Sequence, residues 1–76
     1  MEDNYPIADK VEYIIAFVNE FGNAHGLSDR QAYRYLERFK AIDFLDQYYG
    51  VAHTRSFADM VNEITAYCHR HGGAIA

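Results

Sequence analysis

Cysteine, long apolar runs and leader-like segments are scarce or absent in this sequence. A single cysteine, Cys68, stands among 76 residues, so no disulfide can form within the chain, and this suits a reducing compartment. No apolar run approaches the roughly 20 residues that a membrane-spanning helix needs. The amino terminus lacks the basic segment followed by an apolar run that marks a signal peptide. These absences predict a cytoplasmic protein that does not enter the membrane.

Motifs of catalysis, cofactor binding and metal binding are also absent. The chain has no glycine-rich phosphate loop, no Ser-His-Asp set, no HExxH and no CxxC pair. Cys68, His69 and His71 lie close together, but zinc is usually held by two short-spaced pairs of ligands, and no second pair is present. We therefore expect no catalytic residue, no cofactor and no metal, and we interpret Cys68 as a buried structural side chain.

Basic residues are few, because seven Lys and Arg stand against eleven Asp and Glu, for a net charge of -4. Such a balance argues against a protein that binds nucleic acid by neutralising phosphates. The charge is uneven along the chain. Residues 1–29 hold six acidic residues against one lysine, whereas residues 30–55 hold five basic residues against three acidic ones. The middle of the chain is therefore a basic segment within an acidic protein.

Apolar and aromatic residues, in contrast, are plentiful. Half of the residues are hydrophobic, and seven tyrosines and five phenylalanines supply an ample core for a chain of this length. Their spacing is helical almost throughout, with no alternating strand pattern. This predicts an all-α fold, a compact single-domain bundle over residues 1–76 with frayed ends at about 1–8 and 72–76. We expect four helices, at about 9–25, 29–39, 41–49 and 56–71.

Short polar side chains and glycines set the expected helix ends. Asp9 is a candidate N-cap for the first helix, and Ser28 with Gln31 forms a capping-box pattern before the second. Thr54 or Ser56 is placed to cap the last helix. Gly50 is expected to end the third helix.

The first and last helices should supply most of the core. Their apolar residues recur at three- and four-residue steps, which places them on one side of each helix. Phe21, Phe57, Val61 and Ile64 are expected to be deeply buried. The apolar face of the first helix comprises Ile7, Val11, Ile14, Phe17, Val18 and Phe21.

Three arginines form the least ordinary charged feature. Arg30, Arg34 and Arg38 recur at i, i+4 and i+8, which places them in a stripe along one side of the second helix. Such a stripe is compatible with a solvated surface and with a binding face. In a binding face, arginine would pair with either carboxylate or phosphate. The acidic balance of the rest favours a protein partner over DNA. Tyr33 and Tyr48 are added as candidate contact residues, because tyrosine is enriched at protein interfaces.

The connector YYGVAHTRSF, residues 48–57, carries a histidine and a threonine. A tight turn leaves backbone groups that need hydrogen-bond partners, and His53 and Thr54 would supply them, so we interpret the segment as a joint between helices. His53 is also a candidate partner-binding residue. A catalytic alternative would combine His53 with Asp43 or Asp46 in a small enzyme, although so short a helical chain leaves little room for a pocket.

Three runs carry a resemblance: EYIIAFVNEF, HGLSDRQAYRYLERFKAIDFLDQYYGVAHTRSF and VNEITAYCHRHGG. Together they resemble a family of small bacterial helical domains of unknown function. The pattern is a helix ending near HGLS, followed by YL, AIDFL, YY and HTxS, over about residues 11–72. Members of that family look like companions of small ADP-ribosyltransferase-like toxins. The resemblance implies an antitoxin or accessory partner, and it assigns no catalytic residue.

We therefore expect a non-catalytic protein-binding domain, an antitoxin-like partner of a small toxin. The alternative is a transcriptional regulator that uses the second and third helices as a helix-turn-helix. Nucleic acid is not expected as a ligand under the leading hypothesis, and self-association into a homo-oligomer stays open.

Overall fold

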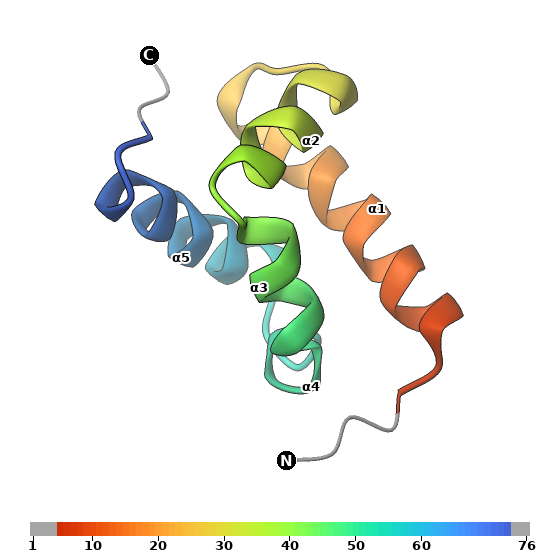
Figure 1. Ribbon diagram of the computed structural model, residues 1–76. Helices are drawn as coiled ribbons and strands as arrows, with labels where there is room; N and C mark the ends of the chain where they lie inside the picture. Colours follow the sequence, from red (N-terminus) through yellow and green to blue (C-terminus); the bar gives the residue numbers. More distant parts are fainter. Residues whose placement is uncertain (1–4, 74–76) are drawn as a thin grey trace.

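Helices account for the regular structure of this protein. The computed structural model describes residues 5–73, and within that range it contains helices and turns but no strand (Figure 1). The expected all-α fold is confirmed, but the expected number of four helices is wrong. The described helices are α1 (Ile7–His25), α2 (Asp29–Arg38), α3 (Ala41–Gln47), α4 (Tyr49–Ala52) and α5 (Phe57–Arg70). None of them combines the length and the apolar character that crossing a membrane requires.

Serine side chains begin two of the helices. The Ser28 hydroxyl accepts a hydrogen bond from the Gln31 backbone N–H at 3.1 Å, and the Ser28 N–H donates to the Gln31 side chain at 2.9 Å. The expected capping box is therefore confirmed. Ser56 caps α5 in a similar way by accepting from the Asp59 N–H at 3.1 Å.

The first helix begins two residues earlier than expected. Asp9 is not its N-cap, because Pro6 occupies that position in an extended conformation. The Pro6 carbonyl accepts from the N–H groups of Asp9 and Lys10 at 3.1 and 3.3 Å, so the helical hydrogen bonds already start there. Ile7 is consequently the first helical residue.

The carboxyl end of the described chain is packed. Gly73, expected in a frayed end, is buried against the rings of Tyr35 and Phe39. A Cβ at Gly73 would lie 2.9 Å from the nearest Phe39 carbon, so the backbone runs close to these rings. Residues 1–4 and 74–76, also expected in frayed ends, lie outside the described residues.

Gly50 does not end the third helix, so this expectation is wrong. The chain bends at Tyr48, whose φ is -106° and ψ is 21°, and the N–H groups of Val51 and Ala52 then donate to the Tyr48 carbonyl. These bonds start α4, which contains Gly50. A Cβ at Gly50 would lie 3.1 Å from Cε2 of Tyr5. The glycine therefore makes space for an aromatic ring instead of stopping a helix.

The core lies where α1, α2, α3 and α5 meet (Figure 1). Phe21 and Ile64 are fully buried and Val61 is nearly so, as expected. The expected deep burial of Phe57 is wrong, because this residue is only partly buried in the first turn of α5. It lies at the edge of the core and stacks on Tyr13 with 5.4 Å between ring centroids. The largest fully buried side chains are Phe17, Phe21, Leu36, Leu45, Ile64 and Cys68.

Gly22 allows α1 and α2 to approach each other closely. A Cβ at this position would lie 2.7 Å from the Leu27 carbonyl oxygen and 3.4 Å from Cβ of Ala32. The Gly22 carbonyl accepts from the N–H groups of Gly26 and Leu27, and Gly26 has a left-handed conformation that ends α1. The two helices are therefore fixed against each other at the carboxyl end of α1.

The amino-terminal half of α1 extends past α2 (Figure 1). Its 19 residues make the helix about 28 Å long. Ile7 is 79% exposed, Ile15 65% and Val11 48%. The expected placement of Ile7 and Val11 on a buried face is therefore wrong. Ile7 and Val11 belong to the amino-terminal half of α1, beyond the part that α2 covers. Each four-residue step also turns about 40° around the helix axis, away from the side that buries Phe17 and Phe21.

Candidate protein-binding surfaces

The three arginines of α2 lie on its exposed side. Arg30, Arg34 and Arg38, here called the arginine stripe, are all exposed, and the opposite side of α2 buries Ala32 and Leu36 in the core. Within the described part of the chain, none of the three guanidinium groups forms an ion pair with a carboxylate. Their N–H groups are therefore available to acceptors on another molecule.

An aromatic ring lies beside each end of the arginine stripe. Tyr33 is 42% exposed and stands three residues after Arg30, which makes the two side chains neighbours on the helix surface. The Arg38 guanidinium carbon lies 5.6 Å from the centroid of the Phe39 ring, a cation–π distance. Arginine and exposed tyrosine together are typical of the centre of a protein interface.

Tyr48 belongs to a different surface. Its ring is half exposed and packs on Phe44 with 4.7 Å between centroids. Phe44 packs on Tyr67 at 4.9 Å, and Tyr67 packs on His71 at 4.4 Å. These four rings form an aromatic row from the end of α3 to the end of α5. Within the described residues, no ring contact or ion pair joins this aromatic row to the arginine stripe.

His53 and Thr54 form the joint between α4 and α5. His53 Nδ1 donates to the Tyr49 carbonyl at 2.7 Å, and the imidazole stacks on the Tyr49 ring with 4.6 Å between centroids. Thr54 Oγ1 donates to the Val51 carbonyl at 2.6 Å. Both side chains bond to the backbone of the preceding turn, as the joint interpretation requires. His53 is also exposed, so its contact with a partner stays a prediction.

The residues of the catalytic alternative, His53 with Asp43 or Asp46, have other partners or none among the described hydrogen bonds and ion pairs. Asp46 forms an ion pair with Lys10, with 3.2 Å between Oδ1 and Nζ, and this pair joins α3 to α1. Among the residues that the structure describes, no hydrogen bond or ion pair joins His53 to Asp43 or Asp46. The geometry therefore supplies no acid–base pair at this joint, and the absence of catalysis stays a prediction.

Cys68 is fully buried on the inner side of α5. Burial raises the pKa of its thiol, and the nearby Tyr35 hydroxyl offsets part of that rise. Burial also raises the pKa of Tyr35, whose hydroxyl has no hydrogen-bond partner of ordinary geometry among the described residues. Metals bind the thiolate, so a buried protonated thiol is a poor ligand. Over the same part of the chain, no three His, Cys, Asp or Glu side chains gather as a metal site.

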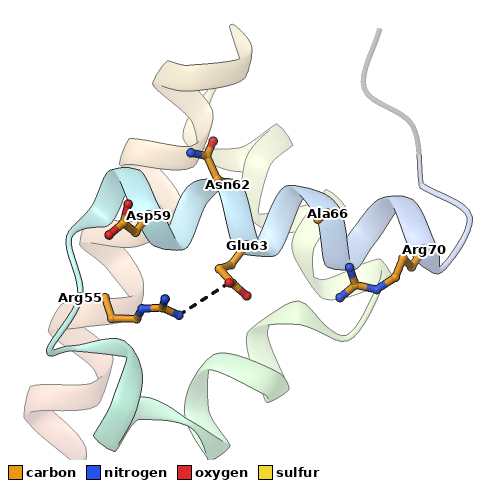
Figure 2. A pocket seen from close by; sticks show the side chains of 6 residues that line it. All are labelled: Arg55, Asp59, Asn62, Glu63, Ala66 and Arg70. Carbon is orange, nitrogen blue, oxygen red and sulfur yellow. Dashed lines mark ion pairs between the residues drawn. The ribbon is translucent and has the colours of Figure 1, made fainter.

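An open groove of about 400 Å³ follows the outer side of α5 (Figure 2). Arg55 and Arg70 lie at its two ends, and Figure 2 shows the Arg55 side chain directed toward Glu63. Arg55 Nη1 lies 3.7 Å from Glu63 Oε2, and both side chains are about half exposed. The charged side chains that line the groove are thus partly paired with one another and open to water. The groove therefore offers a ligand few groups for strong binding. The lining residues are Arg55, Asp59, Asn62, Glu63, Ala66 and Arg70.

Comparison with known proteins identifies a family for this chain. Residues 12–71 match the family described as "Protein of unknown function (DUF3791)". The chain belongs to this family. No curated protein and no solved structure matches it. The family description states no activity, so the association with ADP-ribosyltransferase-like toxins stays a prediction from resemblance.

The matched segment of this DUF3791 protein covers α2 to α5 and includes α1 from Glu12 onward. The arginine stripe, the aromatic row and His53 all lie inside it. Ile7 and Val11 lie before it. The exposed face of α2 therefore belongs to the part of the chain that the family shares, whereas the first turn of α1 does not.

Helical spacing alone missed the exposed apolar side chains of α1 and α4. Ile15 and Val51 are 65% and 61% exposed. Ile7, Val11 and Ile15 recur every four residues, and each such step turns about 40° around the helix axis. Residues at this spacing therefore move progressively away from the core face of the helix. A search that accepts any three- or four-residue recurrence does not distinguish such a set from residues that stay on the core face.

Proposed function

We propose that this domain is a non-catalytic protein-binding module, an antitoxin-like partner of a small toxin, and that the arginine stripe is the centre of its binding face. One observation carries the proposal. The stripe is exposed and has no ion pair within the described residues, although the protein as a whole is acidic. Like charges four residues apart on a helix repel one another, so an acidic partner would stabilise them. Members of the family look like companions of small toxins, and this resemblance supports a toxin as the partner.

Arginine and tyrosine would carry the contact in different ways. Arg34, at the centre of the stripe, presents a planar fork that pairs with a carboxylate through two parallel hydrogen bonds. Tyr33 adds a large apolar ring and a hydroxyl at a small cost in conformational entropy. A partner with carboxylates spaced along one element fits this face. Binding there would cover the active cleft of the partner or hold it in an inactive state.

Co-expression with the product of the neighbouring gene tests this proposal. The wild-type domain should co-purify with that product and restore growth where the product is toxic. Arg34→Ala combined with Tyr33→Ala should lose both effects, because anchors at an interface centre each cost about 2 kcal/mol or more on truncation, or about 30-fold in affinity. Arg70→Ala removes an arginine from α5 and should keep both.

Circular dichroism must show that the double variant is still helical. If that variant binds and protects like the wild type, the binding face lies elsewhere and the role of α2 is refuted. Tyr48→Ala tests separately whether the aromatic row takes part in the contact.

A transcriptional regulator is the second candidate. It is favoured by the tight turn between α2 and α3, where Lys40 has a left-handed conformation with a φ of 65°. It is opposed by α3, which spans seven residues and whose exposed charges, Asp43 and Asp46, are both acidic. We expect no discrete gel-shift complex with the upstream DNA of its own gene at low salt. A complex whose affinity fell by about 0.9 decades per decade of salt for each neutralised phosphate would favour the regulator.

A further inference from the structure

An uncovered apolar stripe lies on the first half of α1. Ile7, Val11 and Ile15, here called the α1 stripe, are all exposed. Because they stand four residues apart, they line up over about 12 Å of helix. Single exposed apolar side chains are ordinary, but a contiguous row on a small domain marks a contact surface.

The charged side chains that α1 exposes are all acidic. Asp9, Glu12 and Glu20 are exposed, whereas the side chain of the one lysine in α1, Lys10, is 15% exposed and lies 3.2 Å from Asp46. Glu12 directly follows the central residue of the α1 stripe. Among these carboxylates Glu12 borders the stripe, whereas Asp9 and Glu20 lie more than about 100° around the helix axis from it. No exposed cation of α1 offsets the charge of Glu12.

From this juxtaposition we propose that the α1 stripe is a second binding site, for an amphipathic helix of another protein whose apolar side chains are flanked by Lys or Arg. Apolar anchors spaced four residues apart on that helix would pack against Ile7, Val11 and Ile15. Its cations would lie beside Glu12. This site is separate from the arginine stripe and does not rest on the function proposed for α2.

A second copy of this chain fits the α1 stripe less well. A two-fold antiparallel pairing centred on Val11 would set Ile7 of one copy against Ile15 of the other, which suits the apolar side chains. The same pairing brings the two Glu12 carboxylates toward each other. Like charges placed together at an interface are unfavourable, and a basic partner avoids this repulsion. Charge therefore selects a cationic helix as the occupant.

A pair of designed peptides tests this site. One is a fluorescein-labelled helix of about 14 residues, or about four turns, with leucines four residues apart and lysines beside them. The other has glutamate in place of each lysine. Both are titrated against the folded domain by fluorescence anisotropy. Ile7→Ser combined with Ile15→Ser removes the anchors, and Val51→Ser, which changes an equally exposed apolar residue of α4, is the matched control.

We expect the lysine peptide to bind and the glutamate peptide to bind at least about tenfold more weakly. The Ile7→Ser, Ile15→Ser variant should bind the lysine peptide at least about tenfold more weakly than the wild type, because two apolar anchors are lost. Val51→Ser should leave the affinity unchanged. All these substitutions lie on the surface, so circular dichroism should show the same helix content.

Equal binding of both peptides would overturn the proposal, as would equal affinity of the Ile7→Ser, Ile15→Ser variant and the wild type. Sedimentation that showed a wild-type dimer, dissociated by the same two substitutions, would also overturn it, because the occupant would then be a second copy. Growth rescue through Arg34 is an independent measurement, so the two proposals can fail separately.

Discussion

Ile64 lies at the middle of α5 and is fully buried. Ile64→Ala should lower the free energy of unfolding by about 2–5 kcal/mol, because it removes buried apolar atoms and leaves a cavity. That is a large share of the about 5–15 kcal/mol that stabilises a typical domain. Urea denaturation measures the change. Val51→Ala, on the surface, should cost less than about 0.5 kcal/mol, and an equally small cost at Ile64 would show that the core face of α5 is misassigned.

Buried thiol and hydroxyl groups make the stability depend on alkaline pH. Burial raises the pKa of Cys68 above its ordinary 9.0, and burial raises the pKa of Tyr35 and of Tyr13 above 10.0. The folded state therefore holds these protons more tightly than the unfolded chain does. The resulting stability is complete below about pH 9 and is lost as the pH rises further. Melting temperatures measured between about pH 7 and about pH 11 should fall accordingly.

Tyr35→Phe is the matched variant for this pH dependence. It removes one titrating group and a buried hydroxyl without a hydrogen-bond partner among the described residues. The variant should be at least as stable as the wild type at neutral pH and should lose less stability at alkaline pH. An alkaline loss as steep as that of the wild type would mean that Tyr35 does not contribute to it.

At the scale of the helices, Gly22 lets the end of α1 pack closely against the segment that connects it to α2. Alanine forms helices better than glycine by about 1 kcal/mol. Gly22→Ala should nevertheless lower the melting temperature, because the new Cβ would lie 2.7 Å from the Leu27 carbonyl oxygen. Asn23→Ala, one residue further and exposed, is the control and should be neutral or mildly stabilising. A gain in stability at both positions would contradict the close approach of α1 to the Leu27 carbonyl.

Lys40 holds the turn between α2 and α3 in a conformation that favours glycine. Its φ of 65° is left-handed, which costs a residue with a Cβ about 1–2 kcal/mol. Lys40→Gly should therefore raise the free energy of unfolding by up to about 1 kcal/mol. Lys40→Val should lower it, because a β-branched side chain tolerates this conformation poorly. Chemical denaturation measures both changes. Opposite changes in the free energy of unfolding for the two variants would support the left-handed conformation of Lys40, and a loss of stability with glycine would argue against it.

Helix starts could be predicted where the signal is local. Ser28 and Ser56 cap their helices because each cap needs only the backbone of the following turn. The role of Gly50 could not be predicted from such a local signal. A glycine is compatible both with a helix stop and with a packing contact, and the ring that decides between them belongs to Tyr5, far away in the sequence. The short helix α4 lies almost wholly in the connector expected after the third helix, and the packing of Tyr5 on Gly50 is not contained in any local pattern.

At the scale of the whole molecule, the packing of the helices decides which predicted residues share a surface. The arginine stripe could be predicted because it lies within one helix. The sequence could not show that Tyr48 and His53 lie on surfaces other than the arginine stripe. The ring of Tyr48 belongs to the aromatic row that reaches α5, and His53 packs at the end of α4. The exposure of Ile7 has a related cause. Periodicity identifies the apolar side of a helix but not how far a neighbour covers it.

On the function proposed above, the arginine stripe binds an acidic face of a protein partner. Isothermal titration calorimetry with the purified product of the neighbouring gene measures this binding, with Arg34→Ala, Arg70→Ala and the wild type compared at equal salt. We predict that Arg34→Ala weakens binding by about 30-fold and that Arg70→Ala changes it by less than about threefold. A folded Arg34→Ala variant that bound as tightly as the wild type would contradict the claim.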